Sequence, residues 1–69
     1  RDLLSVLTSR QQEVLQTAVE LGYYDESQNA EYEDIADELG VSVSTVGHHL
    51  RKSESRILRE VVSGLDETG

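Results

Sequence analysis

IADELGVSVSTVGHHL, residues 35–50, is the stretch that decides how this chain folds. A short apolar helical pattern runs into Gly40, and a second helical pattern begins after the serine at position 42. The small Ala36 lets two helices cross closely, Gly40 takes a left-handed turn conformation, and the branched Val46 holds the second helix against the first. This spacing predicts a helix-turn-helix, and the second helix of such a unit normally enters the major groove of DNA.

Length and composition narrow the class of protein. The 69 residues form one small domain with no room for an enzyme cleft. The chain has no cysteine, which excludes disulfides and thiolate metal sites, and it has neither an apolar run of about 20 residues nor a signal peptide. We therefore expect a cytoplasmic binding domain with no cofactor, no metal, no membrane contact and no catalysis. Because the sequence starts with Arg1, we also expect it to be part of a larger protein.

The net charge of −8 is unevenly distributed along the chain. Residues 1–42 hold two basic and ten acidic side chains, whereas residues 43–63 hold four basic and two acidic ones. The second helix of the motif is thus the one region with net positive charge, as a nucleic-acid-reading surface requires. The overall excess of acids, with one lysine against five arginines, is typical of proteins adapted to a high-salt cytoplasm. The alternative is an ordinary acidic surface.

Periodicity predicts an all-α, three-helix bundle. The expected helices cover about residues 9–21, 32–39 and 43–63. Thr8 and Gln11 form a capping box at the start of the first helix, and Gly22 is a natural stop. Ser42 is the expected cap of the third helix.

The domain boundaries follow from these helices. Residues 1–7 are either the end of a linker helix or a segment that packs beside the bundle. Residues 8–63 form the helix-turn-helix domain, and residues 64–69 form a tail. On the third helix, the expected buried stripe consists of Val46, Leu50, Ser53, Ile57 and Val61.

Several tyrosine, glycine and histidine residues could have either a structural role or a role in binding. Tyr23 and Tyr24 are expected to cover the core as a lid rather than stack on a ligand. Gly47 either permits close approach of a sugar–phosphate chain or is a tolerated helix glycine. His49 is expected to be half-buried with its ring satisfied, and His48 to face outward. Because adjacent histidines on a helix point about 100° apart, they do not share a metal ion.

The outward arc of the third helix supplies the candidate contacts to double-stranded DNA. Expected contacts to base edges come from Ser44, Thr45, His48 and Arg51. Expected phosphate contacts come from Ser42, Lys52, Ser55 and Arg56, together with the backbone amides at the helix N-terminus. The rival hypothesis is a protein-binding helix-turn-helix that docks on RNA polymerase or a partner regulator. Its docking face would be the solvated acidic side of the second helix, formed by Glu33, Asp34, Asp37 and Glu38.

Two segments resemble the bacterio-opsin-activator-type helix-turn-helix domain of halophilic archaea. Residues 7–15, LTSRQQEVL, and the following A-x-x-L-G-Y-Y of residues 18–24 resemble its opening. Residues 33–42, EDIADELGVS, and the S-T-V-x-x-H-L-R-K of residues 44–52 continue the pattern. The resemblance covers about residues 7–62. It implies a C-terminal DNA-binding module of a transcriptional regulator, behind an N-terminal sensory domain.

This chain departs from the family pattern at three places. Ser27-Gln28 stands where a proline–arginine pair is common, Glu31 where a threonine cap is common, and Ser53 where alanine is usual. A homodimer is a further hypothesis, because helix-turn-helix modules commonly pair on half-sites about one DNA turn apart. The apolar residues available for pairing are Leu3, Leu4, Val6, Val62 and Leu65.

Overall fold

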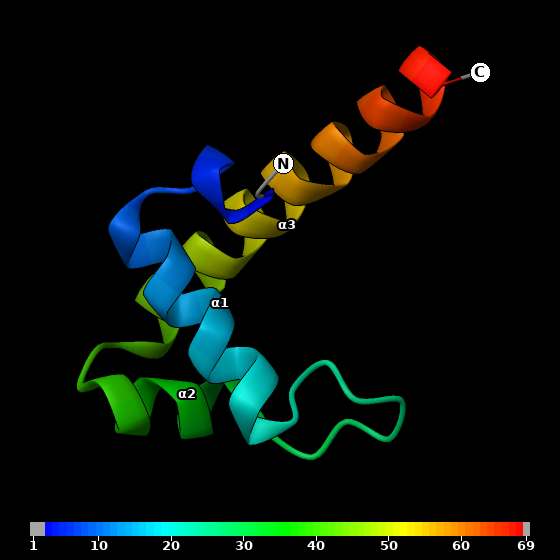
Figure 1. Cartoon of the computed structure of the whole chain (residues 1–69). Helices are drawn as coiled ribbons and strands as arrows, with labels where there is room; N and C mark the ends of the chain where they lie inside the picture. The colour runs from blue at the N-terminus through cyan, green and yellow to red at the C-terminus, as the bar shows by residue number, and fades with distance from the viewer. Residues whose placement is uncertain (1–2, 69) are drawn as a thin grey trace.

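Three α-helices and one short 3-10 helix make up the computed structural model, which describes the backbone of residues 3–68 and the side chains of residues 3–64. The elements are η1 (Leu3–Val6), α1 (Ser9–Leu21), α2 (Tyr32–Leu39) and α3 (Val43–Thr68). α1 and α2 pack against the first half of α3, while the second half of α3 extends beyond them (Figure 1). The expected all-α bundle with a helix-turn-helix is confirmed.

The local signals at the helix ends act as the sequence predicts. The Thr8 hydroxyl accepts the Gln11 N–H at 3.1 Å, and the Gln11 side chain accepts the Thr8 N–H at the same distance, which completes the capping box. Gly22 ends α1 with a φ of 94°, and Gly40 ends α2 with a φ of 69°. Both values lie in the left-handed region that disfavours side chains with a Cβ.

One stripe of α3 forms the centre of the core. Val46 and Leu50 are fully buried against Val14 and Ala18 of α1 and Ile35 of α2. We call Val46, Leu50 and Ser53 the buried stripe of α3. The Ser53 hydroxyl is also fully buried, but it donates to the His49 carbonyl at 2.7 Å and is therefore satisfied. Serine is thus accommodated at a position where the resembling family has alanine.

Two expectations about the end of α3 are wrong. The helix continues past the predicted end at Ser63 to Thr68, because Gly64 lacks the positive φ that ends a helix. The predicted tail of residues 64–69 is therefore helical through Thr68. Val61, predicted to be buried, is 41% exposed, because α3 has by then passed beyond α1 and α2.

The N-terminal segment packs beside the bundle, which was one of its two expected arrangements. Leu7 is buried, and the Gln12 amide donates to the Leu4 carbonyl at 2.8 Å and to the Leu7 carbonyl at 3.3 Å. Arg56 of α3 donates to the Val6 carbonyl at 3.4 Å. These bonds place η1 beside the middle of α3, where Figure 1 shows it in dark blue.

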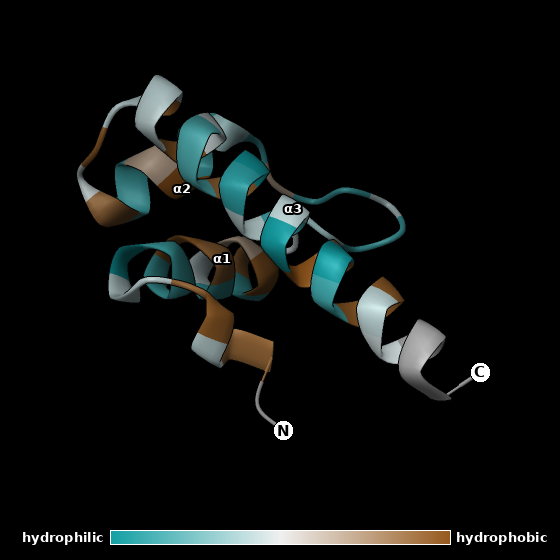
Figure 2. Cartoon of the chain, turned by 90° about the horizontal axis from the view of Figure 1, so that it is seen from above, coloured by the Kyte–Doolittle hydropathy of each residue, from teal (hydrophilic) through white to brown (hydrophobic). Residues whose placement is uncertain are grey.

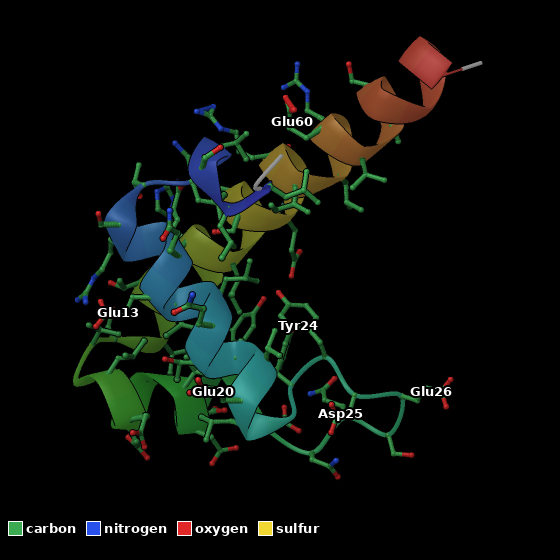
Figure 3. The ribbon with its side chains drawn as sticks, viewed as in Figure 1. Glu13, Glu20, Tyr24, Asp25, Glu26 and Glu60 are labelled. Carbon is green, nitrogen blue, oxygen red and sulfur yellow. The ribbon has the colours of Figure 1, made fainter. Side chains whose placement is uncertain are left out.

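The tyrosine lid lies between the loop after α1 and the other two helices. The Tyr23 ring packs edge-on against Tyr24 at 4.9 Å and tilted against Tyr32 at 5.4 Å between ring centroids. The Tyr24 hydroxyl donates to the Glu54 carboxylate of α3 (Figure 3). Hydrogen bonding to Tyr32, and then burial, raises the pKa of Tyr23 to about 12, and burial with the Glu54 bond raises the pKa of Tyr24. Tyr23 thus packs against the core as expected, whereas Tyr24 stays 41% exposed and is held by its bond to Glu54.

Replacing the two turn glycines by alanine should destabilise the domain to different extents. Gly40→Ala should cost about 1 kcal/mol, because the left-handed conformation is strained but no atom lies within 4 Å of the new methyl group. Gly22→Ala should cost more, because the methyl group would also lie 2.9 Å from the Asn29 Cβ. Urea unfolding followed by circular dichroism measures both changes. Equal losses would contradict the steric contribution at Gly22.

The tyrosines should make the fold sensitive to alkaline pH. Their raised pKa values mean that the folded state favours the neutral phenol, so this stabilisation is complete below about pH 10. It declines above that pH as the phenols of the unfolded chain ionise, and the Tyr23 contribution is lost as the pH rises through about 12. Tyr24→Phe should therefore flatten the decline in stability between those pH values. Urea unfolding at a series of pH values tests this, with Glu54→Gln as the control that keeps a hydrogen-bond acceptor. A decline as steep in Tyr24→Phe as in the parent would contradict it.

Candidate nucleic-acid interface

Hydroxyl groups gather at the N-terminus of α3. The Ser42 hydroxyl accepts the Thr45 N–H at 3.1 Å, which confirms Ser42 as the cap. The same hydroxyl lies 3.2 Å from that of Ser44 and 2.8 Å from that of Thr45. The exposed serines therefore stand beside the first backbone amides of α3, whose partial positive charge favours anions.

One row of candidate residues lies on the most exposed side of α3. Ser44, His48 and Arg51 are all exposed and follow each other at four-residue and three-residue spacing, so they share one face of the helix. This face is opposite the buried stripe of α3, and all three side chains on it are exposed to solvent. Three of the four expected base-reading residues are thus brought together.

A second row faces the N-terminal end of α1. Thr45, Lys52 and Arg56 follow each other at seven-residue and four-residue spacing, so they lie on one side of α3. Thr45 is half-buried, with its hydroxyl close to that of Ser42, and so is less available than the other expected base-reading residues. Ser55 follows Arg51 by four residues and so continues the first row, and it also lines a hollow together with Lys52 and Arg56. The eight expected contact residues therefore form two rows and a hydroxyl-rich end, rather than a single line.

A hollow of about 280 Å³ separates the second row from α1. Its lining consists of Thr8 and Gln11 from the capping box of α1 and of Lys52, Ser55 and Arg56 from α3. Two cations and several hydroxyl or amide groups thus converge from two helices, which is suitable chemistry for a phosphate group. Sequence reasoning missed Thr8 and Gln11 as part of this surface. Their capping signal was evident, but only the crossing of α1 over α3 places that cap beside Lys52 and Arg56.

Gly47 and His49 turn toward the protein. A Cβ at Gly47 would lie 3.1 Å from the Tyr32 ring, so this glycine serves the contact between α2 and α3 rather than an approach to a sugar–phosphate chain. His49 is half-buried as expected, but its Nδ1 is buried without a hydrogen-bond partner in the described part of the chain. His48 is exposed, and the two rings lie 5.6 Å apart. Among the described residues, no three histidine or carboxylate side chains are grouped for a metal ion.

Most of the acidic side chains lie away from the two rows, although Glu60 of α3 borders a hollow together with Arg56. The acids of α2 are all exposed and belong to the face turned from the core: Glu33, Asp34, Asp37 and Glu38. Others lie at the end of α1 and in the loop that follows, where Figure 3 labels Glu20, Asp25 and Glu26. The α3 surface within residues 43–63 therefore carries a net positive charge in an acidic domain.

The chain matches a known family over most of its length. The family described as an HTH DNA binding domain matches residues 7–59, which includes α1, α2 and both candidate rows of α3. No solved structure gives a significant match. In the described residues, no helix is both long and apolar enough to span a membrane.

Two proteins from Haloferax volcanii are similar to this chain in sequence. One, provisionally named a transcriptional regulator, is 36% identical over 67 residues, which is 97% of this chain and 12% of the relative. The other is named transcriptional regulator NarO and is 38% identical over 56 residues, covering 81% of this chain and 26% of the relative. The chain thus matches only about an eighth of the length of the first relative and about a quarter of the second.

Proposed function

This chain belongs to the HTH DNA-binding domain family, and from that membership we propose that it is the DNA-reading output domain of a transcriptional regulator in a halophilic archaeon. It acts in the cytoplasm by binding rather than by catalysis. The observation that carries the proposal is the exposed row Ser44, His48 and Arg51 within residues 43–63, which carry a net positive charge in an acidic domain. Exposed groups on a helix of this motif are those that reach base edges in the major groove.

The two rows have different roles in DNA recognition. Ser44, His48 and Arg51 read base edges, with the guanidinium of Arg51 suited to the two acceptors of a guanine. Thr45 contributes a base contact from the edge of this row. The phosphate contacts come from Ser42, Lys52, Ser55 and Arg56, and they fix the position of the helix in the groove. The hollow beside α1 then receives one phosphate of the backbone, since its cations and hydroxyls converge there.

The domain operates within a longer regulator. Both relatives carry far more sequence than this chain matches, and their names describe regulators of transcription. We place an N-terminal sensory domain in that additional length, and we place this domain at the output end. The protein binds its operator as a homodimer, since one helix in one groove offers few contacts.

Substitutions in the two rows should affect DNA binding differently. Arg51→Ala should cost about 1–3 kcal/mol of discrimination at one base position, because a bidentate contact to a base edge is lost. Lys52→Ala should weaken binding to all sequences about equally, because a phosphate contact carries no sequence information. The measurement is selection of bound genomic fragments, followed by mobility shifts on the selected duplex and on its single-base variants.

Arg59→Ala is the matched control, since Arg59 is exposed on the same helix but lies beyond both rows. Equal and sequence-independent losses from Arg51→Ala and Lys52→Ala would remove Arg51 as a base reader. Absence of any retarded band for the parent domain would instead favour the rival hypothesis of docking on polymerase or a partner regulator.

Salt should strengthen both the fold and DNA binding. Residues outside 43–63 carry two basic and twelve acidic side chains, so the body of the domain repels a duplex that the α3 surface attracts. The Debye length falls from about 10 Å at 0.1 M salt to about 3 Å at 1 M, which screens this repulsion but spares contacts at hydrogen-bonding distance. It also relieves repulsion among the acids of α2. Melting temperature and DNA affinity should therefore both rise over this range of KCl.

Thermal melts and DNA titrations at several KCl concentrations test this expectation. Neutralising part of the body with Asp37→Asn and Glu38→Gln should reduce the salt effect, because both acids are exposed on α2 and distant from the buried stripe of α3. A steep fall of affinity with salt would show that counterion release from DNA dominates.

A further inference from the structure

The second half of α3 exposes an apolar side that the bundle does not cover. Leu58 is 61% exposed, Val62 is 55% exposed and Val61 is 41% exposed. Their spacing of three and four residues places them on one side of the helix, next to the half-buried Ile57. We call Ile57, Leu58, Val61 and Val62 the arm of α3. It extends past α1 and α2 in both views of the molecule (Figure 1 and Figure 2).

A groove adjoins the base of the arm. It has a volume of about 490 Å³ and is lined by Leu15 and Val19 of α1, by Tyr24, and by Glu54, Ile57 and Leu58 of α3. Val19 is 56% exposed within this lining. The one charged group, the Glu54 carboxylate, accepts the Tyr24 hydroxyl and so has a partner inside the groove wall. An apolar ridge and an apolar groove therefore stand side by side on one face of the domain.

We infer that this face binds a second copy of the chain through a twofold axis that crosses the arm near Val61. In a twofold interface the same patch of each copy meets that of the other. A patch that holds both a ridge and a groove can therefore place the ridge of each copy in the groove of the other. If the arms run antiparallel, Val62 of one copy lies opposite Leu58 of the other. The end of each arm then covers the other copy's groove. The inference specifies the surface of the proposed homodimer and so rests on the proposed function for its role.

The length of α3 matches the spacing that DNA reading requires. At a rise of 1.5 Å per residue, His48 lies about 20 Å along the helix from Val61. Two antiparallel copies of α3 joined near Val61 therefore hold their His48 positions about 40 Å apart, and any crossing angle shortens that distance. Half-sites on successive turns of DNA are about 34–36 Å apart. A pair joined at the arms can thus place both reading ends on one side of a duplex.

The exposed area fits a weak dimer. From their exposed fractions, the arm, Val19 and Tyr24 offer roughly 300 Å² of apolar surface per copy. Because interfaces are about 56–65% apolar, two such faces correspond to about 1,000 Å² in total. That value is at the lower limit for a specific interface. We therefore expect association of the isolated domain in the micromolar range, reinforced when DNA holds both copies.

Sedimentation equilibrium of this chain without DNA, in about 1 M KCl to screen the like net charges, tests the interface. The average mass should rise from 7.7 kDa toward twice that value as the concentration rises from about 10 µM to 1 mM. Leu58→Gln with Val62→Gln should raise the dimer Kd at least about tenfold, since both apolar contacts are lost. Glutamine preserves helix propensity, and both sites are exposed, so the melting temperature should not fall. Ser63→Gln, on another side of the same helix, should leave the dimer Kd unchanged.

Disulfide trapping tests the register of the pair. The chain has no cysteine, so Val61→Cys introduces a single thiol beside the proposed axis, and Ser63→Cys introduces one away from it. Mild oxidation should convert Val61→Cys to a covalent dimer several times faster than Ser63→Cys. A monomer at every concentration, an unchanged Kd in the glutamine variant, or equal trapping of the two cysteine variants would each overturn the inference.

Duplexes with one and with two half-sites distinguish DNA binding from pairing. On a duplex that carries one half-site, the glutamine variant should bind as the parent does. On a duplex with two half-sites it should lose the additional affinity that comes from pairing. Loss of binding to the single half-site would count against the DNA-reading surface rather than the arm. Retention of both affinities would count against the arm alone.

Discussion

The buried stripe of α3 is the constraint on which the rest of the structure depends. Val46, Leu50 and Ser53 fix the rotation of α3 about its own axis, because they must face α1 and α2 at the same time. A helix with one face fixed in this way has every other face fixed as well. The exposure of Ser44, His48 and Arg51 is therefore a consequence of core packing, and so is the inward turn of Gly47 toward Tyr32. A substitution in the core could therefore reorient the exposed row even though every residue of that row is unchanged.

The same packing places most acidic and most basic side chains on different helices. α2 must bury Ile35 and Ala36, so its acids can lie only on its outer face. α3 buries uncharged residues in its first half and presents its cations on the opposite side. An acidic total of −8 is compatible with DNA binding because ten of the fourteen acids precede α3, and residues 43–63 hold four basic and two acidic side chains. The net charge of a domain is therefore a poor guide to the chemistry of one of its faces.

Local signals in the sequence predicted most of the fold. The features that the sequence did not predict are not determined by residues that are close together in the chain. The Thr8 capping box, the Gly22 and Gly40 stops and the Ser42 cap act within a few residues, so they can be read from the chain itself. The predicted end of α3 near Ser63 was wrong, because the helix runs on through Gly64, which does not have the positive φ of Gly22 and Gly40. The position of Thr8 and Gln11 beside Lys52 was missed because it depends on the angle at which α1 crosses α3. Periodicity gives the face of a helix but not that angle.

A single uninterrupted α3 links the two surfaces of the domain. An exposed helix of a few turns is marginal by itself in water, so the second half of α3 gains its stability from the anchored first half or from what covers it. In return, a continuous helix transmits orientation along its length, since its backbone hydrogen bonds allow little twist between Arg51 and Val61. A flexible joint at Gly64 would lie beyond both surfaces and would not disturb their relation. The rigidity of α3 therefore fixes the orientation of the DNA-reading row relative to the arm, and no second core is needed to hold the two surfaces in place.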